Sequence, residues 1–175
     1  MEWKNKIAMV QTIEVEHCGN DHLEPIWSIH TKPILGFPKP KRGGLWTSPI
    51  YSENSWRKWC EREDFHLERL NKSFRLEIDT SDLLIINSLD DLTQKMVHPH
   101  IMELDPSGFP YINWERLVDL YNGIWLTARG EAETRHSHPY SFYGWDCETI
   151  FLFNEKPIIK IRENENHTRN RRLAS

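Results

Sequence analysis

The alternation of apolar and polar residues along the chain predicts a set of short strands. Residues 74–79 alternate at every position, which is typical of a strand with one buried and one solvated face. Residues 83–86 form a short apolar run, and residues 7–15 are apolar and partly β-branched. We expect four further strands, at residues 25–30, 124–127, 148–153 and 157–161, and a short run at 45–48 that is stopped by Pro49.

Three stretches with helical spacing lie between these strands. Residues 56–70 place apolar side chains on one face, and the serines at 52 and 55 are suitable caps. Ser88 predicts the start of a helix that runs to about residue 97, and Asn113 predicts the start of another. The segments 32–44 and 128–143 are predicted to be loops, the second long and exposed. Short strands with few helices indicate an α+β fold with a twisted, mainly antiparallel sheet.

Length and charge restrict the classes of protein to consider. A chain of 175 residues fits one domain with its own core, and we expect that domain to span 1–162, followed by a polar, basic tail at 163–175. The net charge of −4 gives no reason to expect long-range attraction of the whole surface to nucleic acid or to an anionic membrane. Eight tryptophans suit either a site for a flat ligand or a tryptophan-rich core.

Cysteine usage and hydropathy suggest a compartment. Cys18, Cys60 and Cys147 are odd in number and far apart, which favours a reducing environment over a disulfide framework. We find neither a signal peptide nor an apolar run of membrane-spanning length in the sequence. The expectation is a cytoplasmic protein that does not contact a membrane.

The stretch 143–154 carries the strongest sign of chemistry. Asp146 and Glu148 are two residues apart beside the apolar run 150–153. If the whole stretch is a strand, both carboxylates leave the same face. A carboxylate at the mouth of an apolar strand loses solvation unless a donor or a cation meets it. The alternative is that both are solvated residues at the start of the strand.

The order of elements in the C-terminal third of the chain resembles the end of the ADP-ribosyltransferase fold, and with two upstream motifs the resemblance spans roughly residues 25–162. In that family a helix leads into a strand, a loop follows, and then come a glutamate-bearing strand and a final strand, as here at 117–126, 148–154 and 157–161. His30 and Thr31 resemble the family's first-strand motif, and residues 45–48 resemble its second. Trp46 replaces the leading serine of that motif, and Asp146 stands where members that modify arginine carry Glu or Gln. Small phage-encoded members exist, including inhibitors of bacterial immunity.

The resemblance implies a mono-ADP-ribosyltransferase that uses NAD⁺ as co-substrate and modifies a macromolecule, a protein side chain rather than a nucleic acid. Glu148 would stabilise the positive charge that develops on the ribose, and Asp146 would serve the acceptor side. The NAD⁺-binding residues that it implies are His30, Thr31, Trp46, Thr47, Ser48 and Tyr51. His30 would anchor the dinucleotide, the two hydroxyls would position it, and Trp46 or Tyr51 would stack on nicotinamide. Each of these residues also has a structural reading, as a turn cap or a core side chain.

Three other functions remain open on the sequence. A metal enzyme would draw on His17, Cys18 and His22, or on the pairs His98/His100 and His136/His138, although no second pair follows at zinc-site spacing. A binding or inhibitor protein without catalysis could use the same fold to occupy a partner surface. Nucleic-acid contact could run through the basic tail.

Overall fold

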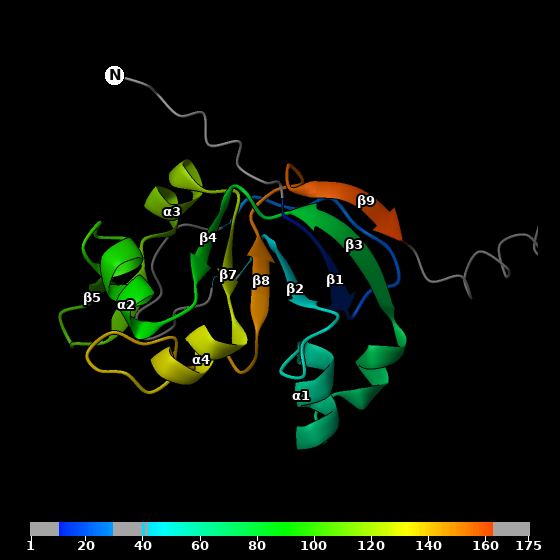
Figure 1. The fold of residues 1–175 in the computed structure, drawn as a ribbon, viewed down its shortest axis with the longest axis horizontal. Coiled ribbons are helices and arrows are strands. Elements are labelled where there is room, and N and C mark those ends of the chain that lie inside the picture. The colour runs from blue at the N-terminus through cyan, green and yellow to red at the C-terminus, as the bar shows by residue number, and fades with distance from the viewer. Residues whose placement is uncertain (1–10, 30–39, 41, 163–175) are drawn as a thin grey trace, which may run out of the picture.

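The central feature of the computed structural model, which describes residues 11–29, 40 and 42–162, is a seven-stranded sheet (Figure 1). The strands are β1 (Thr12–Cys18), β2 (Leu45–Pro49), β3 (Ser73–Asp79), β4 (Leu83–Ile86), β7 (Gly123–Leu126), β8 (Thr149–Leu152) and β9 (Ile158–Arg162). They lie in the order β4-β7-β8-β2-β1-β3-β9. The β4–β7 pair is parallel and the other five pairs are antiparallel, so the sheet is mixed.

Strand β2 joins the two halves of the sheet. It pairs along its first three residues with β8, and with β1 through Val15 opposite Pro49 and Glu16 opposite Ser48. Beyond Glu16, β1 continues to pair with β3 as far as Cys18. The imidazole of His17 lies toward β2 there, with Nδ1 2.8 Å from the carbonyl oxygen of Trp46. A side chain thus bridges β1 and β2 where the backbone ladder between them ends.

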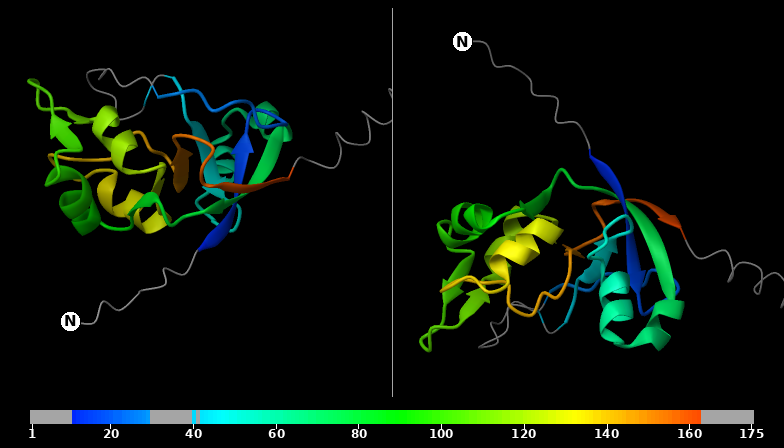
Figure 2. Two further views of the ribbon diagram at one scale, coloured as in Figure 1. Left: turned by 90° about the horizontal axis from the view of Figure 1, so that it is seen from above. Right: turned by 60° about the horizontal axis from the view of Figure 1, so that its bottom comes forward.

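Short helices connect the strands. They are α1 (Trp56–Glu63), the 3₁₀ turn η1 (Leu67–Asn71), α2 (Leu89–Leu92), the π turn η2 (Thr93–Val97), α3 (Trp114–Leu120) and α4 (Ala128–Thr134), and a small hairpin consists of β5 (Met102–Leu104) and β6 (Pro110–Ile112). In Figure 1, α2, α3, α4 and β5 surround the β4 side of the sheet, and α1 extends below β2 and β1. The two further views in Figure 2 keep α1 beside β3, away from α4.

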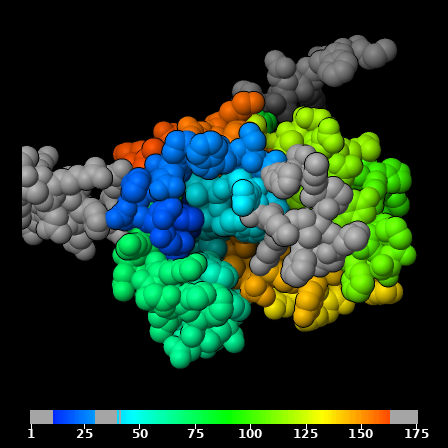
Figure 3. Space-filling view, turned by 180° about the vertical axis from the view of Figure 1, so that it is seen from behind, coloured from blue at the N-terminus to red at the C-terminus, as the bar shows by residue number. Residues whose placement is uncertain are grey.

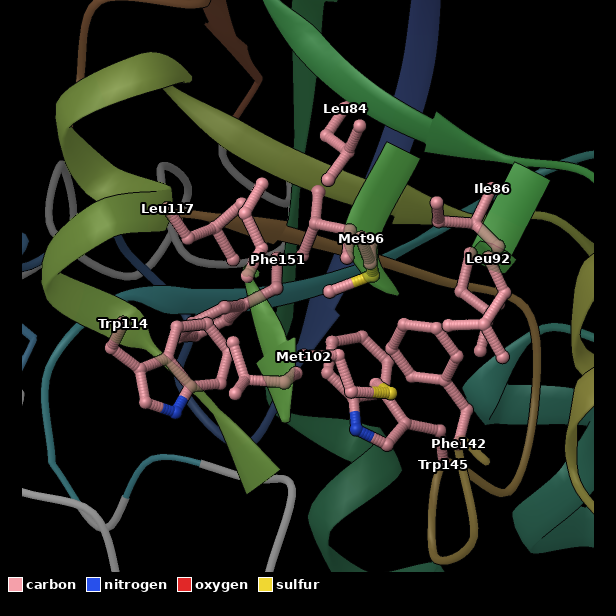
Figure 4. Close-up of a cluster of buried hydrophobic side chains, with 14 of the residues drawn as sticks. Leu84, Ile86, Leu92, Met96, Met102, Trp114, Leu117, Phe142, Trp145 and Phe151 are labelled. Carbon is pink, nitrogen blue, oxygen red and sulfur yellow. The ribbon is translucent and has the colours of Figure 1, made fainter. Parts of the chain in front are cut away.

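Two apolar clusters make up the core. The larger one joins β4, β7 and β8 to the helices, and Figure 4 shows Trp114, Leu117, Phe142, Trp145 and Phe151 in it. The smaller one is built from alternate residues of β1, β3 and β8 together with Trp125. Side chains of β8 alternate between them, with Phe151 in the larger cluster and Ile150 in the smaller one.

The mixed α+β class predicted from the sequence is confirmed at this level, with a large sheet and four α-helices among the described residues. The strand at 83–86 has the predicted bounds, and Ser88 and Asn113 cap helices as expected, since their side chains accept from Asp91 N and Arg116 N. The tail at 163–175 lies outside the described residues.

Several expected elements differ from those observed. The helix expected over 56–70 ends at Glu63, because Asp64 adopts a left-handed conformation (φ 53°) and its N–H donates to Cys60 O. Residues 25–29 form no strand; Trp27 O instead accepts from Gly44 N. The hairpin of β5 and β6 was not expected.

The predicted exposed loop at 128–143 was wrong over its first half, which is helix α4. Thr127 caps this helix by accepting from Gly130 N, and the pairs Arg129–Glu133 and Arg135–Glu131 link successive turns. Gly130 disfavours a helix by its intrinsic propensity, but it allows α4 to pack closely on β4. A Cβ there would lie 2.1 Å from the carbonyl oxygen of Ile86.

Candidate functional site

A cavity of about 470 Å³ opens where β1 and β2 separate. Its wall comes from Pro40 and from four segments that are far apart in sequence: the end of β1, β2, the α1–η1 region and residues 145–149. The wall residues are Glu16, His17, Cys18, Pro40, Trp46, Thr47, Ser48, Trp56, Phe65, His66, Arg69, Trp145, Asp146, Cys147 and Thr149. Figure 3 shows these segments meeting on one face, in blue, cyan, blue-green and orange.

Strand β2 contributes the three predicted residues Trp46, Thr47 and Ser48 to this wall. Thr47 Oγ1 donates to Ile150 O and Ser48 Oγ donates to Glu148 O, each at 2.8 Å. Both buried hydroxyls therefore fasten β2 to the segment that carries Glu148. Ser48 Oγ also accepts from Trp56 N at 3.0 Å, which fixes the start of α1 against the same strand.

Aromatic rings form much of the cavity wall. The Trp46 ring stacks on Phe151, with centroids 4.2 Å apart, and meets Trp145 edge-on at 5.0 Å. Elsewhere in the wall, Trp56 stacks on Trp59 and is met edge-on by Phe65. Flat, apolar walls of this kind suit a flat ring as ligand.

Asp146 lines the cavity and belongs to a chain of polar contacts behind it. Arg135 donates to Asp146 Oδ1 and to Glu131 Oε1, both at 3.0 Å. Glu131 is buried and its second oxygen accepts from Asn54. The hydrogen bond to Glu131, followed by the charges of Asp146 and Glu131, raises the pKa of Arg135, so the guanidinium is firmly cationic.

Glu148 is 5% exposed, and its carboxylate accepts from the indole Nε1 of Trp125 at 2.9 Å. It is not a wall residue of the cavity, although its neighbours Cys147 and Thr149 are. Among the described residues no cation pairs with it; the indole is its side-chain hydrogen-bond partner. A buried carboxylate that meets only a neutral donor keeps most of its charge uncompensated.

The expectation that Asp146 and Glu148 leave one face of a single strand was wrong. Strand β8 begins at Thr149, so period-two alternation does not extend to residue 146. Backbone contacts hold this approach to the strand instead, since Glu148 N donates to Asn54 O at 2.8 Å. As a result Asp146 contributes to the wall while Glu148 contacts Trp125, a member of the smaller core cluster.

Tyr51 was expected to stack on a ligand, but it is 60% exposed and is not part of the wall. Partial burial first, and then the negative charge of Glu148, raise the pKa of its phenol. It therefore lies within electrostatic range of Glu148, outside the cavity.

His30 and Thr31 lie outside the described residues, and the imidazoles observed at the cavity are those of His17 and His66. Because Trp46 O can only accept, Nδ1 of His17 must carry the proton, and the neutral ring leaves Nε2 as an acceptor. Burial lowers the pKa of His17, against the opposing effects of the bond to Trp46 and the charge of Glu16. On the sequence, His17 was a candidate only as a metal ligand. Its place near the end of a strand, two residues before Gly19, was the feature that could have indicated a site residue.

The turn between α1 and η1 was also missed as part of the site. Asp64 and His66 both have positive φ, 53° and 46°, and between them Phe65 reaches the cavity. Left-handed backbone at two non-glycine residues within three positions is strained, and strain of this kind concentrates at functional sites.

Glu16 is the other carboxylate of the wall, and Arg57 binds it with both Nε and NH2, at 2.8 and 3.0 Å. Burial opposes its ionisation, but the hydrogen bond and charge of Arg57 outweigh burial and lower the pKa of Glu16. Burial, and then the charge of Glu16, raise the pKa of Cys18 to about 12, so this thiol stays protonated near neutral pH.

Within residues 11–29, 40 and 42–162, no three histidine, cysteine or acidic side chains gather as metal ligands do. None of the helices in this part of the chain has the length and apolar character needed to cross a bilayer.

Comparison of the chain with protein-family models, with curated proteins and with solved structures finds no match.

Proposed function

We propose that the cavity binds NAD⁺ and that the chain transfers its ADP-ribose to a macromolecular acceptor, a protein side chain rather than a nucleic acid. The observation that carries this proposal is the pairing of an aromatic cavity with a buried carboxylate, Glu148, which lies between the wall residues Cys147 and Thr149 and has no cationic partner among the described residues. On this proposal the two-part sheet joined by β2 is of the ADP-ribosyltransferase type.

The chemistry of the wall suits the nicotinamide end of NAD⁺. The nicotinamide ring is flat and cationic, and such rings are attracted to the faces of tryptophans. Trp46 on β2 and Trp56 on α1 both contribute such side chains to the cavity wall. Glu148, which meets no cation among the described residues, adds a negative potential that favours a cation, whereas Asp146 is paired with Arg135.

In the proposed reaction, the bond between the ribose C1′ and the nicotinamide nitrogen breaks, and its electron pair leaves with the now neutral nicotinamide. Positive charge develops on the sugar until the acceptor's nucleophilic atom bonds to C1′ and releases its proton. A fixed negative charge beside the sugar lowers the energy of this transition state. We assign that charge to Glu148.

Glu148 must turn from Trp125 toward the cavity to take this role. A hydrogen bond to a charged group contributes about 1.5–3 kcal/mol, so exchanging the indole for a ribose hydroxyl has a small net cost. The backbone anchors from Ser48 and Asn54 hold the residue in place while its side chain moves. Of the two wall imidazoles among the described residues, His17 and His66, we assign the anchoring of the dinucleotide to His17, whose Nδ1 is held by Trp46 O and whose Nε2 can accept.

The test is incubation of the purified chain with cell lysate and NAD⁺ labelled in its adenylate part. We expect label on one macromolecule with the wild type and none with Glu148→Gln, which keeps an oxygen that can accept from Trp125. Free nicotinamide without labelled macromolecule would indicate NAD⁺ hydrolysis instead. If NAD⁺ is neither bound nor consumed, the proposal is wrong, and a binding protein without catalysis becomes the better reading.

A further inference from the structure

Within the described part of the chain, the buried indole N–H of Trp145 has no acceptor. The side chain is 1% exposed, and Nε1 has no hydrogen-bond partner among the described residues. Buried polar atoms in native proteins nearly always have a partner, so an exception calls for an explanation. Leaving such a group unpaired destabilises a fold, and a second molecule that supplies an acceptor removes that penalty.

Trp145 is part of the cavity wall, but Nε1 itself has almost no accessible surface, so a ligand's acceptor reaches it only after a small shift of the wall. Its ring is fixed from two sides, edge-on to Trp46 at 5.0 Å and edge-on to Phe142 at 5.1 Å, and Figure 4 shows it beside Phe142. A ring fixed in this way loses little freedom when it donates to a ligand.

The other buried donors of the wall are already in use. Thr47 donates to Ile150 O, Ser48 to Glu148 O, and Thr149 to Cys147 O. These hydroxyls hold the backbone together, and none can donate to a ligand without giving up that bond. Among the buried wall residues, Trp145 is the one whose donor is uncommitted.

We propose that Trp145 is a specificity-determining residue, whose indole N–H donates to a carbonyl oxygen carried by the flat ring that occupies the cavity. This inference rests on the proposed function: in NAD⁺ the oxygen is that of the nicotinamide carboxamide. A ring without a strong acceptor at that position leaves the donor unpaired and binds more weakly.

The test compares equilibrium binding of NAD⁺ with that of its thionicotinamide analogue, in which sulfur, a weaker acceptor, replaces the carboxamide oxygen. We expect the wild type to prefer NAD⁺ by about three- to tenfold, which corresponds to one hydrogen bond. Trp145→Phe keeps an aromatic ring but has no donor, so its preference falls to near one. The larger size of the sulfur atom affects binding to both proteins, so it cancels when the preference of the wild type is divided by the preference of Trp145→Phe.

Trp114→Phe is the matched control, because Trp114 is buried in the same core cluster but is not part of the cavity wall. We expect it to keep the wild-type preference. If Trp145→Phe binds both dinucleotides and keeps the full preference, the inference is wrong while the proposed function survives. If the wild type binds neither dinucleotide, the proposed function fails and the inference fails with it.

Discussion

Glu16 and Glu148 are two largely buried carboxylates close to the same cavity, and they are satisfied in opposite ways. Glu16, on β1, is held by Arg57 through two hydrogen bonds, so its charge is neutralised locally. Glu148, before β8, meets one neutral indole N–H. A neutralised carboxylate holds a structure together, whereas an uncompensated one exerts a field that can act on a ligand. The contrast assigns a structural role to Glu16 and the proposed chemical role to Glu148.

The largest expected effect separates the two carboxylates by activity. Glu148→Gln is expected to slow nicotinamide release from NAD⁺ by about 10²–10³-fold, because it removes the negative charge beside the ribose. Glu16→Gln is expected to release nicotinamide at a rate within about tenfold of the wild type, because it weakens on the order of one hydrogen bond. Nicotinamide release by both variants can be followed by chromatography. Equal losses of rate in Glu148→Gln and Glu16→Gln would contradict the assignment of different roles to the two carboxylates.

The second effect is on stability and concerns Arg57. Besides Glu16, this guanidinium donates to Leu70 O and contacts Ser73 Oγ, so it links α1 to β1 and to the region leading into β3. Arg57→Ala is expected to lower the free energy of unfolding by about 2 kcal/mol, since it leaves Glu16 without its cation. Urea unfolding measures this loss.

Arg62→Ala is the matched control for Arg57. Arg62 is on the same helix and pairs with Glu63, but both side chains are about half exposed. We expect it to change the free energy of unfolding by at most about 0.5 kcal/mol. A similar loss of unfolding free energy in Arg57→Ala and Arg62→Ala would mean that the pair of Arg57 with Glu16 contributes no more to stability than an exposed ion pair.

A smaller effect is expected at Trp125. Trp125→Phe leaves the Glu148 carboxylate buried without a donor and is expected to reduce the free energy of unfolding by about 1–2 kcal/mol. Adding Glu148→Leu removes both polar partners and should recover much of that loss. If the double variant is no more stable than Trp125→Phe, the indole–carboxylate contact is not what sets the stability of this region.

The smallest effect is the pH dependence due to His17. Burial lowers its pKa in the folded protein, so between that value and the unfolded value near 6.5 the unfolded chain binds more protons. Stability from this group is therefore complete above about pH 6.5 and falls as the pH decreases below it. His17→Asn keeps a donor for Trp46 O without a titrating ring, and it should flatten the curve of unfolding free energy between pH 5 and 6.5. An unchanged slope would show that His17 does not contribute.

The sequence predicts the local features of the fold and part of the site. The caps at Ser88 and Asn113 and the strand at 83–86 depend on neighbouring residues and were recognised. Trp46, Thr47, Ser48 and Asp146 were selected as candidates on the sequence, and all four lie in the wall of one cavity. Helix α4 was missed because its Gly130 disfavours a helix locally, and contact with Ile86, which no local pattern encodes, explains the glycine.

The direction of Glu148 and the role of His17 could not be predicted for a related reason. The side of the chain on which Glu148 emerges depends on where β8 begins, and the contact with Asn54 helps hold the approach to that strand. His17 gains its importance from the separation of β1 and β2, which is a property of the whole sheet.

An experimental structure of Glu148→Gln with NAD⁺ tests the central claim most directly, because this variant should bind the dinucleotide without consuming it. We predict nicotinamide between Trp46 and Trp56, with its ribose beside residue 148, whose side chain has left Trp125. Dinucleotide bound elsewhere, or a residue 148 that remains on Trp125 and out of reach of the sugar, would contradict the claim.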